Sequence, residues 1–338
     1  MEYLNGLPNS KPAVRVPFEN GMAAMATYKW DEAISNFHEA MKHATGTELV
    51  SLHHLVGRCR HKAGRLREAL ESYEESARLA KQYGDKKGKA NALDSIGVIW
   101  RNWEDPDKAG QYHEQALLIA REIGARQEEA YALRNLGGLH IIKGEAAKAL
   151  KLSEDALKIL EEIGDREGQA LLIGDIGIEL EMSEKGEKAK ALQYFERSAE
   201  LSRETGAKDI EAAALANIAG TRWGMADLGT ALRYYEQARK LYREIEQKGL
   251  EAGMLANSGN IMLEKGEHDK AVASHLEAYR TYAGRGTSTG SEQKTYGLGK
   301  CLKAIGWEKF VAACEKAGMS KPEAEKLAKE LTSPAGKV

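Results

Sequence analysis

The chain has 338 residues, of which 42% are hydrophobic and 30% are charged, a balance that is typical of a folded protein and excludes a wholly disordered one. The formal net charge is -2, so the chain lacks the excess of positive charge that would attract nucleic acid or an anionic membrane. The three cysteines, Cys59, Cys301 and Cys314, form no CxxC pair, and they predict a reducing, cytoplasmic location.

The N-terminal segment, residues 1–16, is expected to be irregular. It has no basic start followed by an apolar run, so no signal peptide is expected. No part of the chain approaches about 20 consecutive apolar residues, so no insertion into a membrane is expected either. A helical domain is predicted to follow at residues 17–318.

Small residues recur at a fixed interval through this predicted domain, and we call them the repeat markers. Four of them are glycines that stand 40 residues apart, and the register resumes after a two-residue insertion. A period of this length is typical of repeat solenoids, in which each unit packs only against its neighbours. The repeat markers are Gly57, Gly97, Gly137, Gly177, Ala219, Gly259 and Gly299.

Each repeat is predicted to contain two helices. In residues 89–124, Leu93 and Ile96 belong to an apolar stripe on the first helix. The second helix is expected to stop at Gly124, because glycine readily adopts the left-handed conformation that ends a helix. The same stop is expected in other repeats at Gly84, Gly164, Gly206 and Gly286. An alanine of the second helix, here Ala109, is expected to contact the marker glycine and to let the two helices approach closely.

The C-terminal part of the chain is predicted to close the solenoid. An eighth, weaker repeat begins near Glu292. Ser320, Pro322 and Glu323 then have the spacing of a helix start, with serine as the capping residue. Residues 319–338 are therefore expected to form a capping helix and a tail.

The pattern resembles the tetratricopeptide repeat family over residues 17–318. The resemblance rests on apolar–small pairs such as Ile96-Gly97 and Leu136-Gly137, on the glycine turns and on the alanine series. The 40-residue repeat is similar to the subclass in kinesin light chains, cell-polarity adaptors and MalT-type regulators. This resemblance implies an all-α fold, a right-handed α-solenoid of about eight helix-turn-helix repeats. His113, Ser153 and His275 replace the usual aromatic residue of the second helix.

The resemblance also implies a concave groove lined by the first helices. Its side chains are expected two and three residues before each repeat marker, and one and four residues after it. The residues two before the markers are Ser95, Asn135, Asp175, Asn217 and Asn257. A carboxamide both donates and accepts hydrogen bonds, so these side chains are expected to hold the main chain of an extended peptide. In the alternative interpretation, they tie each first helix to its neighbour.

Arginines from three successive repeats also fall at groove positions. Arg58, Arg101 and Arg134 would favour a partner with acidic residues. The remaining groove candidates are His54, Asp94, Trp223 and Asn260.

No enzymatic or metal chemistry is predicted. His54 and His61 share a helix face, but Cys59 points elsewhere, so no metal site and no cofactor are expected. The chain has no HExxH or GxSxG motif, and its acidic residues fall on exposed helix faces.

These observations predict a non-enzymatic scaffold or adaptor. Its groove would bind a peptide or protein segment. The alternative is a peptide-sensing regulator that changes its superhelical shape to control a partner protein. An enzyme is the third and least supported interpretation.

Overall fold

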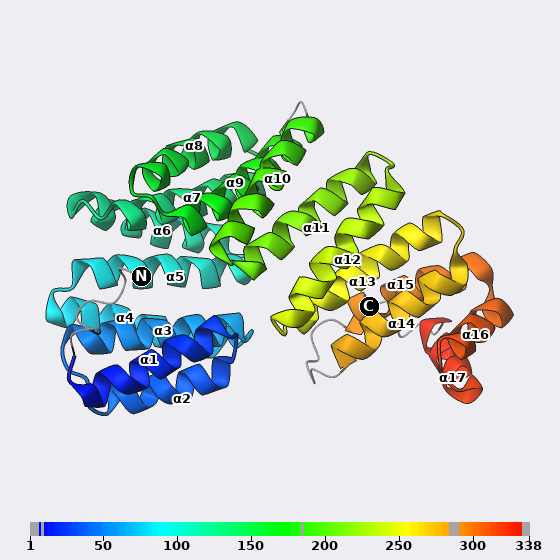
Figure 1. The fold of residues 1–338 in the computed structure, drawn as a ribbon, viewed down its shortest axis with the longest axis horizontal. Coiled ribbons are helices and arrows are strands. Elements are labelled where there is room, and N and C mark those ends of the chain that lie inside the picture. The colour runs from blue at the N-terminus through cyan, green and yellow to red at the C-terminus, as the bar shows by residue number, and fades with distance from the viewer. Residues whose placement is uncertain (1–6, 8–9, 184–185, 284–290, 333–338) are drawn as a thin grey trace. The chain divides into compact units, whose positions relative to one another are not determined.

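The computed structural model describes residues 7, 10–183, 186–283 and 291–332, and the regular structure in these ranges is helical (Figure 1). The chain divides into two compact units, residues 1–194 and 195–338. The first unit contains α1 (Pro12–Ala26), α2 (Trp30–Met41), α3 (Thr47–Lys62), α4 (Leu66–Tyr83), α5 (Lys86–Asn102), α6 (Pro106–Glu122), α7 (Arg126–Ile142), α8 (Ala146–Glu162) and α9 (Arg166–Met182). The boundary falls within α10 (Lys188–Thr205). The second unit continues with α11 (Lys208–Gly224), α12 (Leu228–Glu244), α13 (Lys248–Glu264), α14 (His268–Ala283), α15 (Ser291–Ile305), α16 (Trp307–Lys316) and α17 (Lys321–Thr332).

Consecutive helices pack as pairs inside each unit. The pairs include α3 with α4, α5 with α6 and α7 with α8 in the first unit, and α11 with α12 and α13 with α14 in the second. α17 packs against α16, and the Glu323 carboxylate accepts a hydrogen bond from the Ser320 amide at 3.1 Å. These observations confirm the prediction of an all-α chain of repeated helix pairs with a last helix.

The first helix begins earlier than the sequence predicted. The repeats were expected from residue 17, but α1 starts at Pro12, and Pro17 lies inside it. Pro12 suits the first helical turn because the amide that it lacks would have no partner there, whereas Pro17 lies beyond that turn.

Aspartates and glycines set many of the helix ends. Asp85 is a typical helix start, since its side chain accepts a hydrogen bond from the Gly88 amide at 2.8 Å. Asp105, Asp165 and Asp227 cap their helices in the same way. The predicted stops at Gly84, Gly124, Gly164 and Gly206 all have positive φ, between 66° and 75°. The predicted stop at Gly286 lies outside the described residues.

A ring of the second helix, rather than the alanine, packs on several marker glycines. A Cβ atom added at Gly57 would lie 2.6 Å from Cε1 of Tyr73. The ring of His113 covers Gly97 at the same distance, and that of His275 covers Gly259 at 2.7 Å. In these repeats the nearest neighbour of the marker is therefore this ring and not the predicted alanine. The glycine is required because the ring sits where a side chain would begin.

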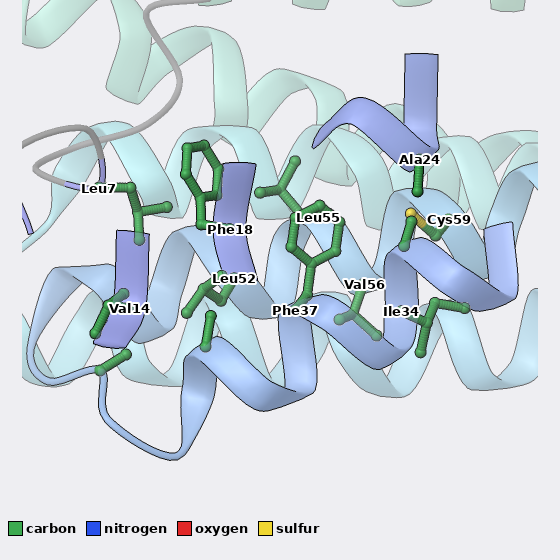
Figure 2. Packing of buried hydrophobic residues seen from close by; sticks show 13 residues of the cluster. Leu7, Val14, Phe18, Ala24, Ile34, Phe37, Leu52, Leu55, Val56 and Cys59 are labelled. Carbon is green, nitrogen blue, oxygen red and sulfur yellow. The ribbon is translucent and has the colours of Figure 1, made fainter. Parts of the chain in front are cut away.

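The apolar core of the first repeats encloses two phenylalanine rings, Phe18 and Phe37 (Figure 2). Phe37 is fully buried, and it lies among Leu52, Leu55 and Val56 of α3. Cys59 belongs to the same cluster and has a free, buried thiol. Each repeat thus buries its apolar stripe against the next one.

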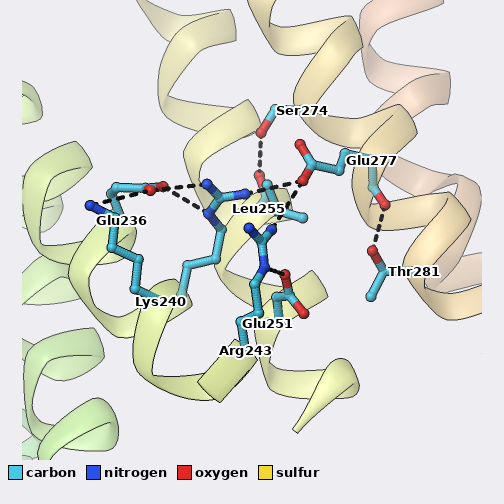
Figure 3. A network of polar contacts seen from close by, with 9 residues as sticks. Glu236, Lys240, Arg243, Glu251, Leu255, Ser274, Glu277 and Thr281 are labelled. Atoms are coloured by element: carbon cyan, nitrogen blue, oxygen red, sulfur yellow. Dashed lines mark hydrogen bonds and ion pairs between the residues drawn. The ribbon is translucent and has the colours of Figure 1, made fainter. Parts of the chain in front are cut away.

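In the second unit, charged side chains link the outer parts of neighbouring helices (Figure 3). Arg243 Nε lies 2.6 Å from Glu251 Oε1, and Arg239 Nε lies 2.7 Å from Glu236 Oε2. Glu277 Oε1 also lies 3.1 Å from Arg239 Nη1 and 3.4 Å from Arg243 Nη2. This network joins α12 to α13 and α14. In the described ranges, no helix has the length and apolar character needed to span a membrane.

Candidate protein-binding surface

The first helices of successive repeats lie closer together than the second helices in the first unit. α3 contacts α5, α5 contacts α7, and α7 contacts α9, whereas α4, α6 and α8 make at most marginal contacts with one another. The first helices are therefore on the inner side of the turn in this unit. Side chains from successive repeats can meet there. We call the surface that the first helices of a unit form its first-helix row.

Among the hydrogen bonds that cross the first-helix row of the first unit with a spacing of 41 residues, three lie at equivalent positions of their repeats. His54 Nε2 is 3.0 Å from Ser95 Oγ, Asn135 Nδ2 donates to Asp94 Oδ2 at 2.8 Å, and Arg134 Nε donates to Asp175 Oδ2 at 2.5 Å. Each bond joins the residue three before one marker to the residue two before the next. Asn135 is only 4% exposed. In this unit, the geometry therefore matches the alternative interpretation, in which these side chains tie neighbouring first helices.

Asp94 is held from a second direction. The Nδ1 atom of His113 donates to Asp94 Oδ1 at 2.6 Å, and His113 is fully buried against Gly97. Both carboxylate oxygens of Asp94 therefore have a partner inside the protein. This residue positions Asn135 and His113 and has little capacity left for a ligand.

The three arginines differ in their surroundings. Arg134 is paired with Asp175, and Arg58 is exposed. Arg101 is partly buried, and it makes no hydrogen bond or ion pair with the described residues. Burial lowers the pKa of Arg101, and the positive charge of Arg134 lowers it further. Arg101 is thus a cation whose hydrogen-bonding capacity is not used within the described structure.

Histidines near the arginines are neutral at physiological pH. Burial lowers the pKa of His54 to about 3, and the charge of Arg58 adds to this shift. Burial likewise lowers the pKa of His61 to about 4. His61 Nε2 lies 2.9 Å from Asn102 Nδ2. The described residues contain no cluster of three groups that could hold a metal ion.

The second unit has free amides on its first helices. Asn217, Asn257 and Asn260 are partly exposed, and in the described ranges their side chains make no hydrogen bond. The Oδ1 atom of Asn260 is buried without a partner. Ala216 stands at the position that would have to bond Asn257, and alanine has no polar atom to offer. A bond equivalent to the three of the first unit is thus missing between α11 and α13.

Trp223 is the remaining predicted groove residue. Its Nε1 atom donates to Glu264 Oε2 at 2.9 Å, across 41 residues of sequence. The indole is therefore fixed between α11 and α13, with part of its surface exposed.

Two features of this surface were not predicted from the sequence. The first is the double role of Asp94. The second is Gly138, which leaves space for Arg101 beside a marker glycine. The Gly137-Gly138 pair in the middle of a predicted helix is the pattern that could have revealed it.

The helix pairs and the first-helix row define a helical-repeat protein. The family model described as tetratricopeptide repeat matches residues 48–122, 101–162 and 128–204. Residues 48–204 therefore match the tetratricopeptide repeat, and the resemblance predicted from the sequence is confirmed for this part of the chain. No curated protein matches the sequence significantly.

Several solved structures share the fold at low sequence identity. A Rap protein complexed with competence and sporulation factor has a TM-score of 0.63 at 14% identity, covering 94% of this chain and 95% of that one. A chain of the APC/C hetero-tetramer Cut9-Hcn1 has a TM-score of 0.62 at 13% identity, covering 98% of this chain and 58% of that one. A STAND protein with a tetratricopeptide repeat sensor from Pyrococcus horikoshii has a TM-score of 0.60 at 15% identity, covering 97% and 50%. Such identities establish the fold alone.

Proposed function

We propose that this protein is a scaffold that binds an extended peptide or protein segment along its first-helix row. The observation that carries the proposal is the set of unbonded amides in the second unit, Asn217, Asn257 and Asn260. Asparagine is a poor helix former, so three of them on two helices need a compensating role. Each carboxamide can pair with one peptide group of an extended chain.

Asn260 gives the strongest support within this set. A buried acceptor without a hydrogen bond costs about 1–3 kcal/mol. If the Asn260 side chain turns its buried Oδ1 toward a ligand, an amide that donates to this atom removes the cost. Binding rather than catalysis also agrees with the fold, and a Rap protein of similar fold was solved in complex with a factor.

Regulation by shape is the second candidate function. The similar Pyrococcus horikoshii structure contains a tetratricopeptide repeat that is described as a sensor. In such a role, ligand binding would change the distance between the ends of the chain. Small-angle scattering of this protein with and without ligand distinguishes the two functions, since a plain scaffold keeps its scattering profile.

The binding proposal is tested with peptides selected from a random library on the intact chain. The combined change Asn217→Ala, Asn257→Ala and Asn260→Ala should weaken binding at least about tenfold, since each lost hydrogen bond contributes about 0.5–1.5 kcal/mol. The melting temperature should not fall, because alanine is the better helix former. Unchanged affinity would place the ligand elsewhere.

Two single variants serve as controls. Asn36 is partly exposed on the second helix α2 and donates to the Glu32 carbonyl at 2.9 Å, so Asn36→Ala should leave binding unchanged. Asn135→Ala removes the hydrogen bond to Asp94 and should lower the stability of the first unit. This contrast separates amides that hold the fold from amides that are available to a ligand.

A further inference from the structure

The second glycine of the Gly137-Gly138 pair has no role in helix pairing. A Cβ atom at Gly137 would lie 3.1 Å from Ser153 Oγ, so this glycine is on the side of α7 that faces the second helix. A Cβ atom at Gly138 would have one described neighbour within 4 Å, Nη1 of Arg101, at 3.3 Å. Glycine is the poorest helix former after proline, so its place in the middle of α7 needs a reason. The structure offers one, which is room for the Arg101 guanidinium.

Arg101 lies among charges that are already paired. Asp94 accepts hydrogen bonds from His113 and Asn135, and Asp175 accepts one from Arg134. Arg101 makes no such bond with the described residues, although both aspartates are near enough to influence its charge. A partly buried guanidinium without hydrogen-bonded partners is unfavourable, and an anion that reached it would relieve this cost.

We propose that Arg101, above Gly138, binds a carboxylate of the partner segment. The planar guanidinium presents two parallel N–H groups that match the two oxygens of a carboxylate. The charges of Arg101 and Arg134 balance those of Asp94 and Asp175, so one negative charge is accommodated more easily than the two of a phosphate. This inference rests on the proposed function and names the chemistry that the first unit recognises.

The subsite is tested without a peptide, by following the side-chain Nε–H resonance of Arg101 in nitrogen-15 NMR spectra. Sodium acetate is the probe, and sodium chloride at equal ionic strength is the control for screening. The resonance is assigned by its loss in Arg101→Gln. Acetate should shift it in a saturable manner, and chloride should not. Equal effects of the two salts would overturn the proposal.

Gly138→Ala provides the matched variant. The added methyl group would occupy the space of the guanidinium end, and this flexible group would have to move. The variant should be at least as stable as the parent, since alanine favours the helix, yet its acetate affinity should fall several-fold. The space that Gly138 leaves for the Arg101 guanidinium is here called the Arg101 notch. An unchanged acetate affinity in Gly138→Ala would contradict its role.

Peptides then identify the source of the carboxylate. Three peptides are compared. The first has blocked ends and internal glutamates, the second has glutamine in place of each glutamate, and the third is this glutamine peptide with a free C-terminus. Of the two peptides that carry a carboxylate, the one that binds the parent more tightly should bind Arg101→Gln at least about tenfold more weakly, as expected for a charge-assisted hydrogen bond. Arg67→Gln, an exposed change on α4, removes the same charge and should have little effect. Equal binding of all three peptides to the parent would overturn the proposal.

The two proposals fail in different ways. If acetate binds at Arg101 but no peptide binds the chain, the carboxylate subsite stands and the scaffold function is wrong. If peptides bind and depend on Asn217 and Asn257, while acetate leaves Arg101 unaffected, the scaffold function stands and the subsite is wrong.

Discussion

At the scale of single residues, the packing of the repeat depends on what stands opposite each marker glycine. Tyr73 and His113 place a ring directly on Gly57 and Gly97. Ser153 is too small to do so on Gly137. The markers look equivalent in the sequence, but the structure predicts that they tolerate substitution differently.

Gly57→Ala and Gly137→Ala form a matched pair that tests this difference. The methyl group at position 57 would overlap Tyr73, and overpacking of this kind costs about 1–3 kcal/mol. At position 137 the nearest atom is Ser153 Oγ at 3.1 Å, and the gain in helix propensity is about 1 kcal/mol. Thermal melting should therefore show a clear loss for the first variant and little change for the second. Equal melting temperatures would mean that the rings move aside easily.

The space left by the small Ser153 is filled by a buried carboxyl group. Ser153 Oγ donates to Glu179 Oε1 at 2.6 Å, and Glu179 is 3% exposed. Its Oε2 atom has no partner among the described residues. Burial raises the pKa of Glu179 to about 7, Asp175 and Glu154 add to the rise, and Ser153 and Arg134 oppose it.

Glu179 should make stability fall as pH rises. Since its pKa is higher in the folded than in the unfolded chain, the folded state binds the proton more tightly. The stabilisation is complete below the ordinary pKa of a glutamate, and it is lost as pH rises through about 7. Glu179→Gln keeps the shape and cannot ionise. Its stability relative to the parent should increase between about pH 5 and pH 8, by about 1.4 kcal/mol for each unit of pKa shift at most.

Urea denaturation at several pH values measures this effect. Glu161→Gln is the control, because Glu161 is exposed on α8 and is not among the charges that shift the pKa of Glu179. Parallel stability curves for Glu179→Gln and the parent would show that Glu179 is not protonated preferentially in the folded state.

At the scale of elements, the period of the sequence predicted the helix pairs and many of their ends. Asp85 and Gly84 could be placed because caps and stops depend on local backbone chemistry. The hydrogen-bond partners on the first-helix row could not be placed in this way. A period of 40 shows that Asp94 and Arg134 occupy equivalent positions, but not that each bonds a residue 41 positions along the chain.

The decisive pattern is a complementarity between neighbouring repeats. The residues that meet are His54 with Ser95, Asp94 with Asn135, and Arg134 with Asp175, each a pair of possible hydrogen-bond partners. In the second unit alanine replaces one member of such a pair, and the amides remain free. A comparison of residues 41 positions apart therefore distinguishes polar groups that bond within the protein from those that are available to a ligand. The position of a residue within its own repeat does not make this distinction.

At the scale of the whole molecule, the two units carry different parts of the proposed binding surface. The first carries the bonded first-helix row and the Arg101 notch, and the second carries the free amides. Since each repeat touches mainly its neighbours, changes in one unit should leave the other folded. The central claim is that the partner segment lies on the first helices.

Photo-crosslinking tests this claim most directly. A selected peptide is made with a photoreactive side chain at successive positions, and the attachment sites on the intact chain are mapped by mass spectrometry. The account predicts attachment to first helices, above all α11 and α13 of the second unit. Attachment confined to the second helices α12 and α14 would contradict it.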